Sequence, residues 1–340
     1  MGNRVANELP RCQMERLQKL VEETDHLWRH RPPPLSIDEQ CAVASDPASD
    51  SDSWQTEDDS LGETELVGFW LDTLCVPVKP PDVRGDQIAK MRHIYADASC
   101  VLVLDRFVEA AALSADTTEK FARLYLSNWQ RRLWTCQEGV LARCLYFQFS
   151  DGQQRLGDLI EEAGLRDDKP LQCTIPALSL DIPAFNEGQM EAFEIGDRFH
   201  PILEAVRMRK TAWKKDETIC LANLLGLDPR PILGLEADPN QDMCDQRMEK
   251  FLSMVGAIPQ GLLFHKMERL STPGFRWAPR TFLGTRLSDQ LIPADPGFVT
   301  ETGETGHVIA QHGLYARFPA YLLVVEAGGI SVSMCCAEVT

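Results

Sequence analysis

The fold class is decided by an apolar run that ends in an acid, Cys100-Val101-Leu102-Val103-Leu104-Asp105. Two further apolar runs resemble it, at residues 67–71 and 144–149, and each is also followed by an aspartate. Segments with helical periodicity separate the runs, at residues 85–98, 116–126 and 129–142. Strands that are apolar along their whole length and alternate with helices are typical of a parallel sheet with helices on both faces. The sequence therefore predicts a doubly wound α/β layer.

The segments that precede this layer have a different composition. Apolar residues recur at intervals of three and four between residues 14 and 28, which predicts an amphipathic helix. Residues 38–65 contain ten acidic residues and no Lys or Arg. Such a segment can bury little apolar surface, so we expect a disordered acidic insertion.

The pattern changes again after residue 152. Three helices are expected there, at residues 199–211, 216–226 and 245–257. Strand-like alternation begins near residue 306 and continues towards the end of the chain. We therefore expect two domains, with the α/β layer in 1–152 and an α+β region of unknown role in 153–340.

Composition and charge exclude several classes of function. The 340 residues are 44% hydrophobic and 25% charged, with a net charge of −17. An acidic chain is poorly suited to nucleic acid or anionic membranes, which attract basic surfaces. No stretch of about twenty apolar residues is present, so we expect no membrane span. The eleven cysteines include no Cys-x-x-Cys pair, which argues against a metal site and favours a cytoplasmic protein.

Residues 67–149 also carry a series of motifs. A Trp-Leu-Asp run leads into Cys75, a helix with Met91 and Ile94-Tyr95 follows, and the next strand ends at Asp105. The last motif is Trp129-Gln130-Arg131-Arg132-Leu133-Trp134-Thr135-Cys136-Gln137-Glu138. Together these motifs resemble the fungal heterokaryon-incompatibility (HET) domain family, which has a Trp-x-x-Arg-x-Trp-x-x-Gln-Glu helix. A weaker match follows at Asp216-Glu217-Thr218-Ile219-Cys220-Leu221.

The resemblance implies a role in fungal self/non-self recognition and regulated cell death. HET domains are similar to TIR domains, so it also implies a flavodoxin-like sheet and, in Glu138, a catalytic acid that cleaves nicotinamide from NAD. A carboxylate suits this reaction because breaking the glycosidic bond builds positive charge on the ribose. NAD would then be a substrate, and no resident cofactor or metal is expected. The candidates for holding it are Asp72 and Asp105 at strand ends and Arg131 and Trp134 near Glu138.

Each candidate also has an ordinary structural interpretation. Asp is a common turn and helix-cap residue, which fits Asp72, Asp105 and Asp151. A Trp and a Glu four residues apart on a helix are usually a packed aromatic ring and an ion-paired or surface carboxylate. For Cys75 and Cys136 we expect inert, buried thiols.

The opening strand of HET domains has no counterpart in this sequence, so we expect a truncated flavodoxin/TIR-like sheet. In the flavodoxin-like order that strand lies between the second and third strands. Three arrangements remain open: residues 67–72 pair directly with 100–105, residues 321–325 fill the gap, or a row of backbone groups is exposed.

Three functions also remain open. The chain is a self-associating signalling module, an NAD glycohydrolase that uses Glu138, or a truncated and non-functional family member. As a signalling module it would bind further copies of itself or other cell-death signalling proteins.

Overall fold

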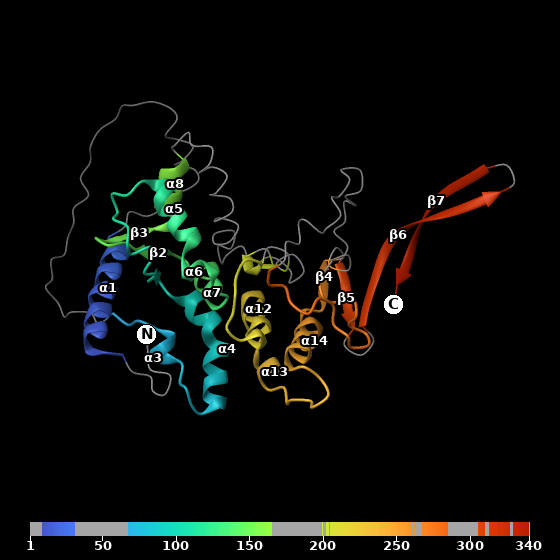
Figure 1. Ribbon diagram of the computed structural model, residues 1–340, viewed down its shortest axis with the longest axis horizontal. Coiled ribbons are helices and arrows are strands. Elements are labelled where there is room, and N and C mark those ends of the chain that lie inside the picture. The colour runs from blue at the N-terminus through green and yellow to red at the C-terminus, as the bar shows by residue number, and fades with distance from the viewer. Residues whose placement is uncertain are drawn as a thin grey trace, which may run out of the picture. The chain divides into compact units, whose positions relative to one another are not determined.

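The computed structural model describes residues 9–30, 67–164, 199, 202–203, 205–259, 262, 267–284, 305–309, 313–326 and 329–339 (Figure 1). Contacts divide the chain into two units, 1–75 and 76–340. The predicted acidic insertion at 38–65 lies outside the described residues, and the predicted domain boundary near 152 stays a prediction. Among the described helices, none is long and apolar enough to cross a membrane.

The first unit contains the helix α1 (Arg11–Arg29) and the helical turn α3 (Asp72–Cys75). The amphipathic helix predicted for 14–28 is confirmed. Salt bridges one turn apart, such as Arg11 to Glu15 at 2.8 Å, lie on its exposed surface. The strand predicted for 67–71 is wrong, because these residues have no regular structure. Asp72 instead starts α3 and accepts a hydrogen bond from the Thr73 amide at 2.6 Å, as a turn-forming aspartate does.

A small mixed sheet is the centre of the second unit. Its strands are β1 (Val101–Val103), β2 (Leu145–Gln148) and β3 (Gln153–Arg155). β1 and β2 are parallel, which confirms two of the three predicted strands, whereas β3 is antiparallel to β2. A tight turn connects β2 to β3. In this turn the Phe149 amide donates to the Gly152 carbonyl at 2.8 Å. Among the described strands, β1 pairs only with β2, so one of its edges has no strand beside it.

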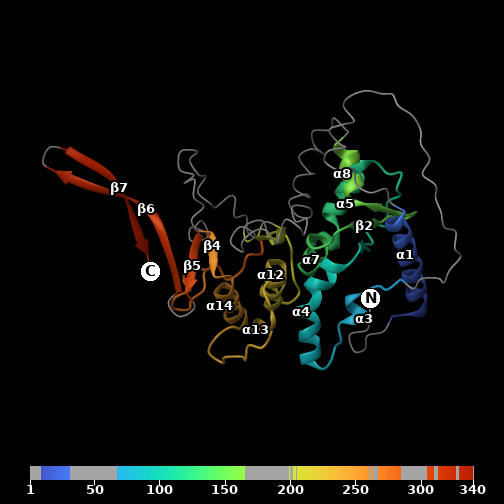
Figure 2. The ribbon, with the colours of Figure 1, turned by 180° about the vertical axis from the view of Figure 1, so that it is seen from behind.

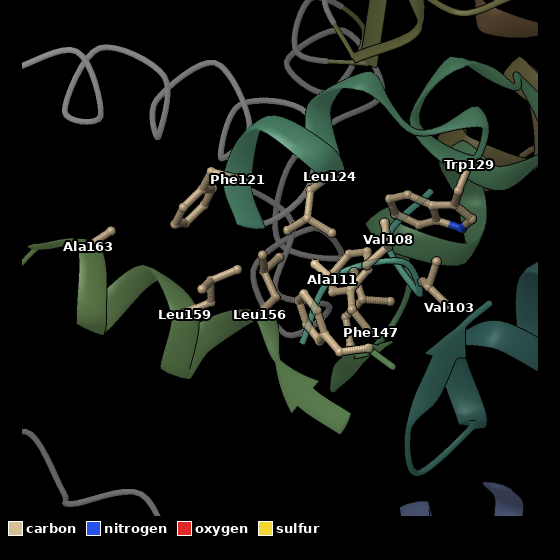
Figure 3. Packing of buried hydrophobic residues seen from close by; sticks show 12 residues of the cluster. Val103, Val108, Ala111, Phe121, Leu124, Trp129, Phe147, Leu156, Leu159 and Ala163 are labelled. Atoms are coloured by element: carbon tan, nitrogen blue, oxygen red, sulfur yellow. The ribbon is translucent and has the colours of Figure 1, made fainter. Parts of the chain in front are cut away.

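The longer helices around these strands are α4 (Pro81–Asp97) before β1, α5 (Thr117–Leu126) and α7 (Trp134–Val140) between β1 and β2, and α8 (Leu156–Gly164) after β3. α5 begins where predicted because Asp116 caps it, accepting from the Thr118 amide at 2.8 Å. Phe121 and Leu124 of α5 and Leu159 of α8 pack with Phe147 of β2 in one buried cluster (Figure 3). Burying side chains of this size stabilises the fold by about 1.5–3 kcal/mol each.

A group of helices follows in the chain. It consists of the 3-10 turn η1 (Lys214–Asp216), α12 (Glu217–Leu225), α13 (Arg230–Leu233) and α14 (Met243–Val255). The helices predicted at 216–226 and 245–257 are confirmed, and α12 ends at Gly226, whose positive φ of 77° suits glycine. Of the helix predicted at 199–211, the described residues between 199 and 206 are helical.

α4 packs against α12 and α13 (Figure 2). Hydrogen bonds join α4 and α12 in both directions. Arg92 Nη1 donates to the Asn223 carbonyl at 3.0 Å, and Asn223 Nδ2 donates to the Ile88 carbonyl at 3.2 Å. These bonds hold the helical group to the part of the chain that carries the sheet.

The last strands form a separate antiparallel sheet in the order β4 (Ala257–Pro259), β5 (Thr305–Ile309), β6 (Gly313–Glu326) and β7 (Gly329–Val339). This confirms the strand-like pattern expected after residue 306. Residues 321–325 pair with β7, so the idea that they fill a gap beside β1 is wrong. β5 pairs with β6 only up to Tyr315, and beyond that point β6 and β7 form a two-stranded ribbon (Figure 1).

Candidate functional site

The motif 129–138 forms a junction of two short helices, α6 (Asn128–Arg131) and α7. The prediction of one helix over 129–142 is wrong, because Arg132 has extended backbone, with φ −83° and ψ 136°. Backbone pairing with Lys210 stabilises the break. The Lys210 amide donates to the Arg131 carbonyl at 2.6 Å, and the Leu133 amide donates to the Lys210 carbonyl at 2.9 Å. Tertiary contacts here override helix propensity.

Glu138 is half-buried on α7 and contacts two other helices. Its Oε2 accepts a hydrogen bond from Trp129 Nε1 of α6 at 2.8 Å. The hydroxyl of Tyr95 on α4 donates to Oε1 over a long 3.5 Å. The Trp129 ring in turn meets Phe147 edge-to-face, with centroids 5.5 Å apart. Glu138 therefore satisfies the polar edge of an indole whose apolar body lies in the core.

Trp134 and Arg131 do not share these partners. Trp134 Nε1 donates to Asp216 Oδ2 at 3.1 Å, which links α7 to η1. Arg131 is exposed to solvent. The structure therefore places Trp134 and Glu138 on the same short helix, but Trp134 binds Asp216 of η1 whereas Glu138 binds Trp129 of α6 and Tyr95 of α4.

The aspartates that follow the three predicted strands accept hydrogen bonds from backbone amides. Asp105 is 6% exposed at the end of β1. Its Oδ1 accepts from the Phe107 amide at 2.9 Å and its Oδ2 from the Trp129 amide at 3.0 Å. Asp151 accepts from the Leu113 amide at 2.7 Å. Asp72 belongs to the first unit and bonds Thr73. The bonds to Phe107 and Thr73 are local turn contacts, whereas those from the Trp129 and Leu113 amides join segments 24 and 38 residues apart.

The two cysteines of the motifs differ in exposure. Cys136 is fully buried on α7, as predicted. The prediction is wrong for Cys75, which is exposed at the end of α3. The reason is that residues 67–71 form no buried strand, so the segment leading into Cys75 does not carry its side chain into a core.

A buried arginine that the sequence did not single out completes the junction. Arg209 is 2% exposed, and its guanidinium lies 5.7 Å from the Trp129 ring. Its five hydrogen bonds span 3.1–3.4 Å. The acceptors are the carbonyls of Ala205, Trp129 and Arg132, the Thr135 hydroxyl and the Gln130 side-chain oxygen. Arg209 therefore connects the segment before η1 to both α6 and α7.

A cavity of about 570 Å³ has Arg209 in its wall. It is lined by the segments around 207–218, 242–248 and 280–284, together with Glu268. None of the five site residues predicted from the HET and TIR resemblance lines it. Sequence reasoning missed this cavity because segments far apart in the chain form it, although the weak match at 216–221 falls partly on its wall.

The cavity also contains a carboxyl group with an altered proton affinity. Glu217, at the start of α12, is 4% exposed. Burial raises its pKa from 4.5 to about 6, although the Phe282 amide and the Thr281 hydroxyl donate to it at 2.6 and 2.7 Å. A buried carboxyl with a raised pKa in a cavity is a candidate functional group.

Comparisons of the chain with protein-family models, with curated proteins and with solved structures found no match. The resemblance to HET domains therefore rests on the quoted motifs and stays a prediction.

We expect Glu217 to make the protein less stable as pH rises. Its folded-state pKa of about 6 lies above the ordinary 4.5, so the folded state holds the proton more tightly than the unfolded state. The free energy of unfolding should fall as pH rises between these values, by roughly 2 kcal/mol in total. Glu217→Gln keeps an oxygen for Phe282 and can donate to Thr281, so it should remove this fall. Urea unfolding at pH 4 to 7 measures the effect.

The matched control is Glu161→Gln on the exposed surface of α8, which should retain the pH dependence of the wild type. Wild type and Glu217→Gln curves that run parallel through this pH range would contradict the assignment.

Proposed function

We propose that this chain is a HET-type protein that acts in fungal self/non-self recognition and regulated cell death as a self-associating signalling module. Its N-terminal part would be a truncated, flavodoxin-like relative of TIR domains. The motifs of residues 67–149 support the family, and the mixed α/β architecture with a parallel β1–β2 pair is compatible with it.

One observation carries the choice of a signalling module over an enzyme. Glu138 and Trp134, the two motif residues that the resemblance singles out, already bind side chains of the same chain: Glu138 binds Trp129 and Tyr95, and Trp134 binds Asp216. The carboxylate of Asp105 likewise accepts hydrogen bonds from two backbone amides. The 570 Å³ cavity lies elsewhere in the described structure. Catalysis requires groups that face a substrate, whereas these contacts build a rigid helix junction.

The ribbon of β6 and β7 supports self-association. Its strands pair over Ala316–Glu326 and Gly329–Val339, and within the described residues neither strand has a second partner over this length. A two-stranded ribbon is marginally stable in water by itself. The register places six apolar residues on one side: Tyr321 with Met334, Leu323 with Val332 and Val325 with Ile330. A second copy of the chain offers the same side, as a two-fold interface requires.

We therefore expect the purified chain to form concentration-dependent oligomers. Val332→Glu should weaken association about tenfold or more, because it places a charge among these apolar residues. Ser331→Glu and Ser333→Glu are matched controls, since the register puts both on the opposite side of the ribbon. Sedimentation velocity over a range of protein concentrations measures the association. A wild-type chain that stays monomeric throughout would contradict the proposal.

The glycohydrolase remains the second candidate because Glu138 is half-buried and held in one orientation by two donors, as a general acid or base often is. Incubation with NAD while nicotinamide is measured separates the two functions. We expect no release from the wild type. Release that Glu138→Gln abolishes would instead assign the enzyme. A near-UV circular dichroism spectrum without tertiary signal would favour the truncated, non-functional family member.

A further inference from the structure

We propose that the cavity around Arg209 binds the phosphate group of a small organic phosphate ester. Arg209 and the three lysines Lys210, Lys214 and Lys215 would provide the positive charge, and the apolar part of the wall would contact the organic group. This site is independent of the NAD chemistry considered for Glu138 and of the association through β6 and β7.

The charge of Arg209 is buried without a compensating negative charge. All five of its hydrogen bonds go to neutral acceptors, and among the described residues no carboxylate lies within ion-pair distance of it. Burying a charge is expensive unless an opposite charge accompanies it. An anion in the adjoining cavity would supply that charge in a site where solvent screens it weakly.

The acidic residues of the cavity wall are already occupied. Arg280 binds three of them, Asp242, Asp245 and Glu268, at 3.6, 2.8 and 2.8 Å. The fourth, Glu217, accepts from the Thr281 hydroxyl and the Phe282 amide. These contacts hold the four carboxylates in place. Among the three lysines, the charge of Lys214 also acts on Asp242 and helps to lower the pKa of that carboxyl, but it forms no salt bridge with it.

The three lysines are exposed and line the same cavity. None of them forms a salt bridge with a carboxylate in the described part of the chain. Lys215 has its ammonium 5.9 Å from the Trp213 ring, a weak and exposed contact. In a chain with a net charge of −17, four cations at one cavity that form no salt bridge within the described residues are an unusual local site for an anion.

The volume of the cavity and the apolar part of its wall indicate an organic phosphate ester instead of inorganic phosphate. A cavity of about 570 Å³ lies in the range of small-molecule pockets and is much larger than a phosphate ion needs. Met208, Met248 and Leu283 contribute apolar surface to its wall. A ligand with a phosphate and an apolar or aromatic group therefore fits both parts of the cavity.

The test is isothermal titration of the full chain with AMP, adenosine and inorganic phosphate at low ionic strength. We expect saturable binding of AMP that weakens with added salt, and binding of adenosine and of inorganic phosphate that is at least roughly tenfold weaker than that of AMP. Lys214→Ala/Lys215→Ala should weaken AMP binding by roughly tenfold. The matched control, Lys19→Ala/Lys90→Ala, removes two exposed lysines outside the cavity wall and should leave AMP binding unchanged.

Three results would overturn the proposal. They are no saturable binding of AMP, equal binding of AMP and inorganic phosphate, and equal weakening by the cavity variant and the control. Circular dichroism of each variant verifies that the fold is retained. Because the lysines lie on the surface, their replacement should not affect folding.

Discussion

Arg209→Met is expected to destabilise the protein by about 3–5 kcal/mol. The substitution removes all five hydrogen bonds and leaves the carbonyls of Trp129 and Arg132 and the side-chain oxygen of Gln130 without this donor. Each buried polar group left unsatisfied costs about 1–3 kcal/mol. Removing an unpaired buried charge offsets part of this loss. Because a domain is stable by about 5–15 kcal/mol, the loss should be visible as a large shift in the midpoint of urea unfolding.

Two further substitutions show whether the loss of stability comes from the burial of Arg209, from its charge or from its planar hydrogen-bonding group. Arg131→Met removes an exposed arginine from the neighbouring helix and should change stability by less than about 0.5 kcal/mol. Arg209→Lys keeps the charge but loses the planar group that reaches five acceptors, so it should lose most of the stability that Arg209→Met loses. If Arg209→Met were no more destabilising than Arg131→Met, the junction would not depend on this side chain.

The sequence predicted those elements whose formation depends on burial and local capping. Val101–Val103 and residues 145–147 are apolar runs; β2 is buried along its whole length and β1 is partly buried, and the parallel pairing followed from the intervening helices. α5 could be placed to within one residue because Asp116 is a strong cap.

The errors arose where a contact distant in sequence decides the local structure. Residues 67–71 are as apolar as the strands, but a strand also requires a neighbouring strand, which an apolar pattern does not supply. The helix over 129–142 breaks because Lys210, far along the chain, pairs with its backbone. No periodicity in the sequence reports such a pairing.

In the candidate site, too, the local sequence pattern predicted some residues, whereas contacts distant in sequence decide others. Motif resemblance directed attention to Glu138 and Trp134, and the structure places both at one junction. The resemblance did not indicate Arg209, and it included Glu217 only within the weak match at 216–221 without giving it a role, because burial and the absence of a charged partner are properties of the folded chain. Buried charged groups of this kind are recognised only when segments around 207–218, 242–248 and 280–284 are seen together.

Asp105→Ala should cost about 2–5 kcal/mol of stability. Both carboxylate oxygens accept backbone amides, from Phe107 and Trp129, and alanine would leave these two donors unsatisfied. The Trp129 amide lies in the first turn of α6, so its loss should also loosen the indole that binds Glu138 and meets Phe147. We therefore expect a shift in the unfolding midpoint together with a change in near-UV circular dichroism from the tryptophans.

Comparison with other aspartate variants distinguishes capping from ligand binding at Asp105. Asp151→Ala removes one exposed bond to the Leu113 amide and should cost about 1 kcal/mol or less. Asp105→Asn keeps one acceptor oxygen but turns an amino group towards the other amide, so its cost should lie between those of the two alanine variants. A ligand-binding carboxylate would behave differently, because its removal relieves desolvation and leaves stability unchanged or higher. Equal stability of Asp105→Ala and the wild type would therefore favour the ligand-binding interpretation of this strand end over the cap.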